Sequence, residues 1–132
     1  AANVAGIKLS FDDGAEVLRW LAQVDERLLI MSGNDSVLCE FGRQGGRAVV
    51  SGNAGVFPDV IARSFAAARQ HEDAVSESLG MVLRLTKSGS PDRLKELLRS
   101  RGIDLGGSRV HAVGPCGAAE TALLRQLLER IN

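Results

Sequence analysis

The chain has 132 residues, a formal net charge of zero and 45% hydrophobic residues. This length suits one compact domain, and the apolar fraction is too high for a disordered chain. Because a neutral chain creates no attractive field, we expect neither nucleic acid nor a membrane as a partner. No apolar run reaches the roughly 20 residues of a membrane-spanning helix, and the first residues lack the pattern of a signal peptide. Cys39 and Cys116 lie too far apart in sequence for a disulfide framework or a zinc motif, so we expect a reduced, cytoplasmic protein.

The first 70 residues alternate short apolar runs with helical patterns. The runs at residues 4–10, 27–31 and 48–51 predict buried strands. A short helix is expected at residues 37–41, and a longer helix begins at Pro58, because a first helical turn accepts proline. The helix between the first two strands has an apolar face made of Val17, Leu18, Leu21 and Val24. This succession predicts parallel strands joined by right-handed crossovers.

After residue 70 the pattern is helical. One helix is expected over residues 74–89, and a second begins at Ser90 and ends near Gly102, which suits a left-handed cap. A Gly-rich loop over residues 102–117 then precedes a final helix. The solvated face of the second helix is expected to carry Arg93, Arg99 and Arg101.

Lys8 is the first candidate for chemistry. Only three lysines occur, and Lys8 alone lies within an apolar strand, where alternation places it on the same face as Gly6 and Ser10. An amine among apolar side chains loses part of its hydration, which favours the neutral nucleophile and Schiff-base formation with a ketone or aldehyde. The alternative is a structural lysine whose amine reaches water from a strand end.

Polar turns at residues 32–35 and 51–55 follow the second and third strands. Ligands bind at the carboxyl ends of parallel strands, where Asn34, Asp35 and Asn53 could supply polar groups. The same residue types are also ordinary turn and helix-cap residues. Neither glycine cluster has the spacing of a dinucleotide fingerprint or a P-loop, so no nucleotide role is expected.

The histidines and cysteines give weaker signals. His71, expected at a helix start, and His111 have no partner at ligand spacing, so we expect no metal site. Cys39 is expected on a core face. Cys116 follows Pro115 and has no acid–base partner that the sequence reveals.

Three segments in order resemble one enzyme family: Gly-Ile-Lys at residues 6–8, Ser-Gly-Asn-Asp at 32–35, and Gly-Gly-Arg-Ala-Val-Val-Ser at 45–51. Over nearly its whole length the chain looks like the C-terminal part of the dihydrodipicolinate synthase / N-acetylneuraminate lyase family. The resemblance implies an α/β fold in which residues 1–70 form the last three βα units of a (β/α)8 TIM barrel. Residues 71–132 would then form a C-terminal helical extension.

The resemblance also implies a site. Lys8 stands where the family has the lysine that forms an imine with pyruvate or a related 2-keto acid. The implied activity is a class I aldolase-type condensation, cleavage or dehydration that needs no cofactor besides this covalent imine. The implied substrate-binding residues after the second strand are Gly33, Asn34 and Asp35, of which Asn34 and Asp35 would contact the distal part of the substrate. After the third strand they are Val50, whose backbone carbonyl would face the keto acid, and the rim residues Ser51 and Gly52.

The chain departs from the family pattern at several positions. Gly55 stands where the family often has Asn, and residues 109–115 reduce an Arg-x-Pro-x-x-Pro segment. The chain contains no tyrosine, so the family's proton-relay tyrosine must come from elsewhere. We therefore expect a partial subunit, inactive alone and completed by the remaining barrel segment or by other subunits of a homo-oligomer.

Two other interpretations stay open. The chain could be a non-catalytic half-barrel that self-associates through its open strand edges, with Lys8 in a structural role. It could also be a small complete α/β binding domain, which would require the strands to be covered within one chain.

Overall fold

The computed structural model describes residues 3–25, 27–72, 76–86, 90–107, 109 and 116–131. They form a small parallel sheet and six α-helices, so the fold is α/β. The elements in chain order are β1 (Gly6–Leu9), α1 (Gly14–Gln23), β2 (Leu29–Ser32), η1 (Asp35–Val37), α2 (Leu38–Arg43), β3 (Ala48–Val49), η2 (Asn53–Gly55), α3 (Pro58–Arg69), α4 (Ser76–Thr86), α5 (Pro91–Ser100) and α6 (Ala118–Ile131), where η denotes a 3-10 helix.

The chain divides into two compact units. The first contains residues 1–51 and 62–76, and the second contains residues 52–61 and 77–132. The first unit therefore carries the sheet and most of α3, while the second carries the loop after β3, the first turn of α3, and the helices α4 to α6.

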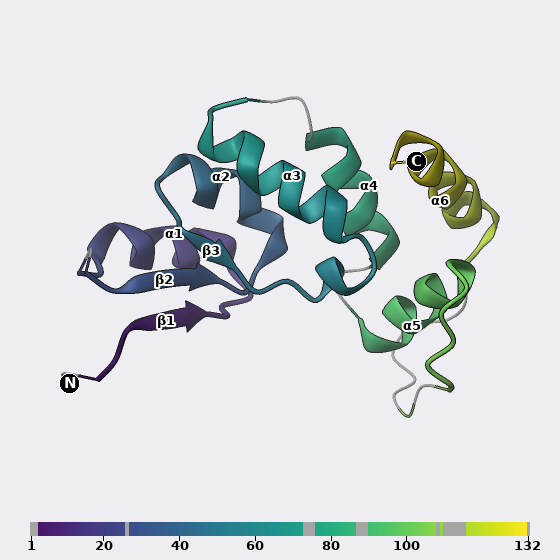
Figure 1. Ribbon diagram of the computed structural model, residues 1–132, viewed down its shortest axis with the longest axis horizontal. Helices are drawn as coiled ribbons and strands as arrows, with labels where there is room; N and C mark the ends of the chain where they lie inside the picture. Colours follow the sequence, from purple (N-terminus) through teal and green to yellow (C-terminus); the bar gives the residue numbers. More distant parts are fainter. Residues whose placement is uncertain are drawn as a thin grey trace. The chain divides into compact units, whose positions relative to one another are not determined.

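The sheet of the first unit has the order β1-β2-β3, with both pairs parallel, and the three arrows run the same way in Figure 1. In the register, Lys8 lies opposite Met31, and Met31 lies opposite Ala48. These three residues therefore share one face of the sheet. The three strands appear in the predicted order, although β3 is shorter than its apolar run.

The opposite face of the sheet holds the core of the first unit. A cluster of buried residues from β1, α1, β2 and α2 packs there: Leu9, Val17, Ile30 and Phe41. The apolar face predicted for α1 is confirmed, because Leu18, Leu21 and Val24 pack against this cluster. The α1 helix begins after Asp13, whose carboxylate accepts a hydrogen bond from Ala15 N at 2.9 Å.

The expected burial of the strands on both faces is wrong for the residues that the structure describes. Ile7 on β1 is 42% exposed, Leu29 on β2 is 36% exposed, and Val50 after β3 is 45% exposed. Ile7 shares its face with Leu9 and Ile30 but is exposed because β1 is an edge strand. Leu29 and Val50 are exposed because the core elements cover only that face, and these two residues lie on the other. An apolar run indicates burial of a strand, but it does not say which chain segment supplies the cover.

In the second unit, α5 has the predicted ends. Pro91 occupies its first turn after Ser90, although the Ser90 hydroxyl donates to the Asp92 carboxylate instead of capping the helix. Gly102 adopts φ +83° after the last turn, as predicted. Gly102 N donates to Arg99 O at 3.0 Å and Ile103 N to Leu98 O at 3.0 Å, which is the Schellman pattern of a helix end.

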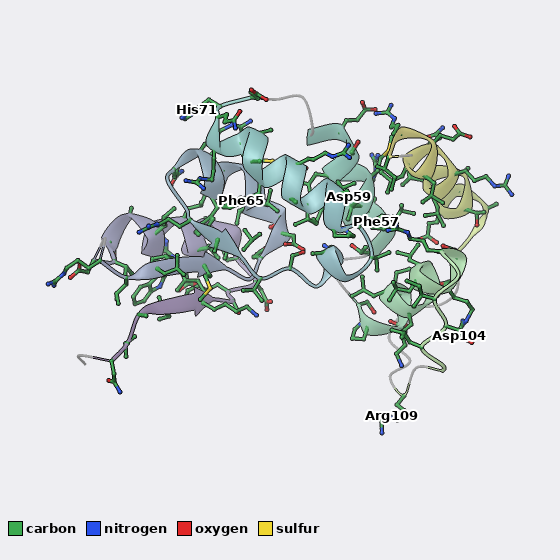
Figure 2. All side chains as sticks on the ribbon, in the orientation of Figure 1. Phe57, Asp59, Phe65, His71, Asp104 and Arg109 are labelled. Carbon is green, nitrogen blue, oxygen red and sulfur yellow. The ribbon has the colours of Figure 1, made fainter. Side chains whose placement is uncertain are left out.

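Two predictions about single side chains are wrong. Arg93 is only 1% exposed, because α5 turns it toward α6 and two carboxylates pair with it, so it does not belong to a solvated face. His71 lies just after the end of α3, with φ +59°, and not at a helix start. Figure 2 labels His71 at this helix end. Residues 74, 75, 89 and 110–115 lie outside the described residues, as does the sequence interpretation of His111.

Candidate functional site

Lys8 and Gly33 lie side by side at the carboxyl ends of β1 and β2. A Cβ added to Gly33 would lie 2.6 Å from Lys8 Cε and 2.7 Å from Ser10 Oγ. The Lys8 side chain therefore passes directly over the Gly33 backbone, next to the Ser10 hydroxyl. This close approach requires glycine at position 33, because any side chain there would displace Lys8 or Ser10.

A backbone hydrogen bond holds Gly33 beside the end of β1. Gly33 N donates to Leu9 O at 2.7 Å, which extends the pairing of β1 and β2 by one residue. Lys8 itself is exposed, so the apolar surroundings expected for its amine are absent among the described residues. What the first unit supplies is the position of the amine on the open face of the sheet.

Asn34 connects the loops that follow β1 and β2. Its Nδ2 donates to Phe11 O and Asp12 O, both at 3.1 Å, and its Oδ1 accepts from Ser36 N at 2.9 Å. The Ser36 hydroxyl also donates to Asn34 Oδ1 at 2.6 Å. Both amide hydrogens and the amide oxygen thus have partners within the protein, which gives Asn34 a structural task at the edge of the site.

Asp35 and Ser51 connect the loops that follow β2 and β3. The Ser51 hydroxyl donates to Asp35 Oδ2 at 2.5 Å, across 16 positions of sequence. Beside them, Val50 N donates to Ser32 O at 2.8 Å, so the chain stays paired one residue past β3. The structure therefore brings Lys8 close to Gly33 and Asp35 close to Ser51. These four residues, Asn34 and Val50 all belong to the first unit. Gly52, the residue after Ser51, belongs to the second unit.

Two serines that the sequence analysis did not select belong to this region. Ser10 lies beside Lys8 and Gly33, and strand alternation was the signal that could have found it. Ser32 is buried at the end of β2, where its Oγ accepts from Asn34 N and donates to Asn34 O, both at 3.1 Å. A serine in an apolar strand gives no sequence signal that separates this turn role from a catalytic one.

A second polar cluster lies in the second unit, between α5 and the start of α6. The buried Arg93 guanidinium pairs with Glu96 at 3.1 Å and Glu120 at 3.5 Å, and it donates to Cys116 Sγ. The backbone joins the cluster, since Cys116 N donates to Glu96 Oε1 at 2.8 Å and Gly117 N to Glu120 Oε2 at 2.9 Å. These bonds attach the start of α6 to α5.

The environment of Cys116 disfavours a reactive thiolate. Burial raises the pKa of the Cys116 thiol, and the nearby Glu96 carboxylate raises it further, while Arg93 acts in the opposite direction. A raised pKa keeps the thiol protonated at neutral pH, and a protonated thiol is a poor nucleophile. The cluster therefore has the character of a structural connection.

The described part of the chain lacks two other kinds of functional feature. It contains no group of three or more His, Cys, Asp or Glu side chains that could hold a metal ion. None of its helices combines the length and apolar character that crossing a membrane requires.

The sequence profile described as "Dihydrodipicolinate synthetase family" matches residues 1–130. No curated protein matches the chain in sequence.

Solved structures share its fold. A dihydrodipicolinate synthase from Aquifex aeolicus is 18% identical with a TM-score of 0.70, and the match covers 100% of this chain and 46% of that one. A 2-keto-3-deoxygluconate aldolase from Sulfolobus, in complex with D-KDPG, is 20% identical with a TM-score of 0.67, covering 96% of this chain and 45% of that one. A monomeric dihydrodipicolinate synthase variant is 23% identical with a TM-score of 0.72, covering 98% and 45%. The chain thus spans less than half the length of these structures.

Proposed function

Because the chain belongs to the dihydrodipicolinate synthetase family, we propose that it forms the lysine-bearing part of a Schiff-base lyase that acts on pyruvate or a related 2-keto acid. The observation that carries the proposal is the position of Lys8 over Gly33, at the carboxyl ends of parallel strands. This is the edge of an α/β sheet at which substrates bind. The aldolase and synthases that share the fold support the same class of reaction.

In the proposed reaction the Lys8 amine attacks the keto carbon of the substrate. The resulting carbinolamine loses water to give an imine between Lys8 and the former keto carbon. Because the imine withdraws electrons from the neighbouring carbon, it assists the making or breaking of a carbon–carbon bond there. The covalent imine performs the electron-withdrawing function that a cofactor would otherwise supply, and the proposed reaction uses no metal ion.

The residues around Lys8 have assigned roles in this proposal. Gly33 leaves space for the lysine side chain, and the carbonyl of Val50 faces the bound keto acid. Ser51 and Gly52 form the rim after β3, which the Ser51–Asp35 hydrogen bond connects to the loop after β2. Asn34 and Asp35 lie on the side of the distal part of the substrate, where Asn34 acts mainly by holding the two loops together.

We further propose that the sheet is part of a (β/α)8 barrel. Residues 1–70 would form its last three βα units and residues 71–132 its helical extension. Two facts support this: the chain covers less than half of each similar structure, and the face that carries Lys8 also carries the exposed Leu29 and Val50. The remaining barrel segment would cover this face, supply a proton relay and support assembly with other subunits. The proposed location is cytoplasmic, where Cys39 and Cys116 would remain reduced.

Trapping with borohydride tests the proposed chemistry in the complete enzyme that contains this chain. Borohydride reduces an imine to a stable amine, so incubation with pyruvate should add the mass of one reduced pyruvate to the peptide that contains Lys8. Lys8→Ala should abolish the adduct. Lys95→Ala is the matched control, because Lys95 belongs to the second unit and its Nζ donates to Gly107 O at 2.9 Å. An adduct that survives Lys8→Ala would show that the assignment is wrong.

The exposed apolar residues of the sheet favour one second candidate. A non-catalytic protein could cover them by self-association through the edges of β1 and β3. Analytical ultracentrifugation of this chain, combined with calorimetric titration of pyruvate, separates the two candidates. Two results together would support self-association. This chain would form a stable oligomer that binds no pyruvate, and the complete protein would give no borohydride adduct.

A further inference from the structure

Few backbone hydrogen bonds hold the end of β3 against β2. The strand contains only Ala48 and Val49, which pair with Met31 and Ser32. One more backbone bond follows, from Val50 N to Ser32 O at 2.8 Å. The next bond between the chain after β3 and the chain after β2 comes from side chains.

Ser51 and Asp35 supply this side-chain bond. Ser51 Oγ donates to Asp35 Oδ2 at 2.5 Å, and both residues are partly buried. Because the acceptor is a carboxylate, the bond is charge-assisted, and such bonds are roughly twice as strong as neutral ones. Both residues belong to the first unit, so the bond lies within one compact part of the molecule.

The carbonyl group of Val50 lies between two anchors. It belongs to the peptide group that joins Val50 to Ser51, and a peptide group is planar. Before this group, Val50 N is bonded to Ser32 O, and after it the Ser51 side chain is bonded to Asp35. A planar group that is held on both sides has little freedom to rotate. The bond between Asp35 and Ser51 therefore restricts the direction of the Val50 carbonyl.

We propose that Asp35 is a positioning residue, which acts through Ser51 to hold the Val50 carbonyl toward the keto acid. The inference rests on the proposed function, in which this carbonyl faces the bound substrate. Strand alternation supports the placement, because Val50 follows Ala48 by two residues and so shares the face of Lys8. In this role Asp35 serves every 2-keto acid, including one with no distal part for a carboxylate to contact.

Pyruvate separates positioning from direct contact, because it consists of the keto-acid part alone. In the complete enzyme, Asp35→Ala and Ser51→Ala should each raise the pyruvate concentration for half-maximal borohydride trapping by about tenfold. The adduct per folded molecule at saturation should equal that of wild type, since Lys8 is intact. Partial unfolding would lower the amount of adduct without shifting the half-maximal concentration, so a merely structural role would not give this result.

Conservative variants and a matched control complete the experiment. Ser51→Thr keeps the hydroxyl and Asp35→Asn keeps an acceptor oxygen, so each should recover part of the loss, and Ser51→Ala carries the test if Asp35→Ala does not fold. Asp25→Ala is the control, because Asp25 is an exposed carboxylate of the same unit that pairs with Arg27. Its half-maximal concentration should equal that of wild type.

The double variant Asp35→Ala/Ser51→Ala should show no larger shift than the single variants, because all three remove the same bond. Additive shifts would overturn the inference. So would a loss seen with a six-carbon 2-keto-3-deoxysugar acid but not with pyruvate, since it would indicate direct contact between Asp35 and the substrate. Unchanged half-maximal concentrations with a normal wild-type adduct contradict the positioning role alone. A missing wild-type adduct contradicts the proposed function and the positioning role together.

Discussion

The Lys8 side chain can lie over the backbone of residue 33 because Gly33 has no side chain. Lys8 Cε and Ser10 Oγ occupy the space that a Cβ at position 33 would enter. Gly33 therefore affects the proposed nucleophile on the neighbouring strand β1 without having a role of its own in the proposed chemistry. For an amine that must meet a keto carbon at a defined angle, a displacement of 1 Å costs as much as about a hundredfold in rate.

We predict that Gly33→Ala slows imine formation in the complete enzyme by about tenfold or more, because the lysine side chain must move away from the new methyl group. The protein should remain folded, since the two closest atoms belong to the flexible end of Lys8 and to the Ser10 hydroxyl, while the backbone oxygen of Leu9, at 3.2 Å, must give by only a few tenths of an ångström. The measurement is the rate of borohydride trapping with pyruvate, together with urea unfolding.

Gly80→Ala in α4 is the control for this substitution, because a Cβ at Gly80 meets no atom within 4 Å. Its trapping rate should equal that of wild type. A Gly33→Ala enzyme with the wild-type rate would show that Lys8 does not depend on the space over Gly33.

Sequence reasoning could predict which residues share this face but not how they bond. Alternation along the strand puts Lys8 with Ser10, and the polar turns place Asp35 and Ser51 at the ends of their strands. The hydrogen bond between Asp35 and Ser51 follows only when β2 and β3 are known to be neighbours. The roles of Asn34 and Ser32 stayed hidden because most of their partners are backbone atoms, which carry no sequence signal.

At the scale of the element, two helices end in the same way with different residues. After α5, Gly102 adopts φ +83°, and after α3, His71 adopts φ +59°. Both ends have the Schellman bonds, since Glu72 N donates to Ala67 O at 2.9 Å and His71 N to Ala68 O at 3.1 Å. A residue with a Cβ is strained in this left-handed conformation, whereas glycine adopts it freely.

We predict that His71→Gly stabilises the protein by about 0.5–1 kcal/mol, because it removes the strain at the end of α3. Gly102→Ala should destabilise it by about 1 kcal/mol for the opposite reason. Urea unfolding of this chain measures both changes. A destabilised His71→Gly would mean that the imidazole makes contacts worth more than the relieved strain.

The two helix ends also show where sequence prediction succeeds. Gly102 directly follows an amphipathic helix and carries a recognisable signal, whereas nothing about histidine predicts a positive φ at position 71. The burial of Arg93 was missed for a related reason. Its partner Glu120 lies 27 residues away, and a helix pattern rich in arginine and glutamate normally indicates a solvated face.

At the scale of the whole molecule, three exposed carboxylates influence acid stability. A hydrogen bond from the Arg130 side chain lowers the pKa of Glu77 below its ordinary value of 4.5. The backbone hydrogen bond from Gly106 and the Arg99 side chain lower the pKa of Asp104, and the Arg27 side chain lowers that of Asp25, both below the ordinary 3.8. A lowered pKa in the folded state stabilises the protein above the unfolded value, and this stabilisation disappears as the pH falls through the folded value.

We therefore predict a decline of the urea midpoint that begins near pH 4.5 and continues to lower pH. Glu77→Gln should reduce the midpoint at pH 7, because Arg130 loses the ion pair whose closest distance is 2.8 Å. The difference between wild type and Glu77→Gln should vanish at the acid end of the titration and shrink in high salt, since the pair is exposed. A difference that stays constant with pH would contradict an ionic origin.

The open face of the sheet is the largest departure from the sequence expectation. The apolar runs correctly predicted three strands, their order along the chain and their parallel direction. They did not predict that Leu29 and Val50 would remain exposed, because covering atoms need not belong to the same segment of chain. Which residues form strands is a local property of the sequence, whereas the cover of a face depends on the complete assembly.

Asn34 has a consequence for changing the substrate range of such an enzyme. Its amide holds Phe11 O, Asp12 O and Ser36 N at once, so it maintains the loops on two strands of the sheet. A library that varies position 34 to reach new substrates would discard most variants through misfolding before selection on activity could act. A library aimed at this part of the rim should therefore keep Asn34 fixed and vary other positions.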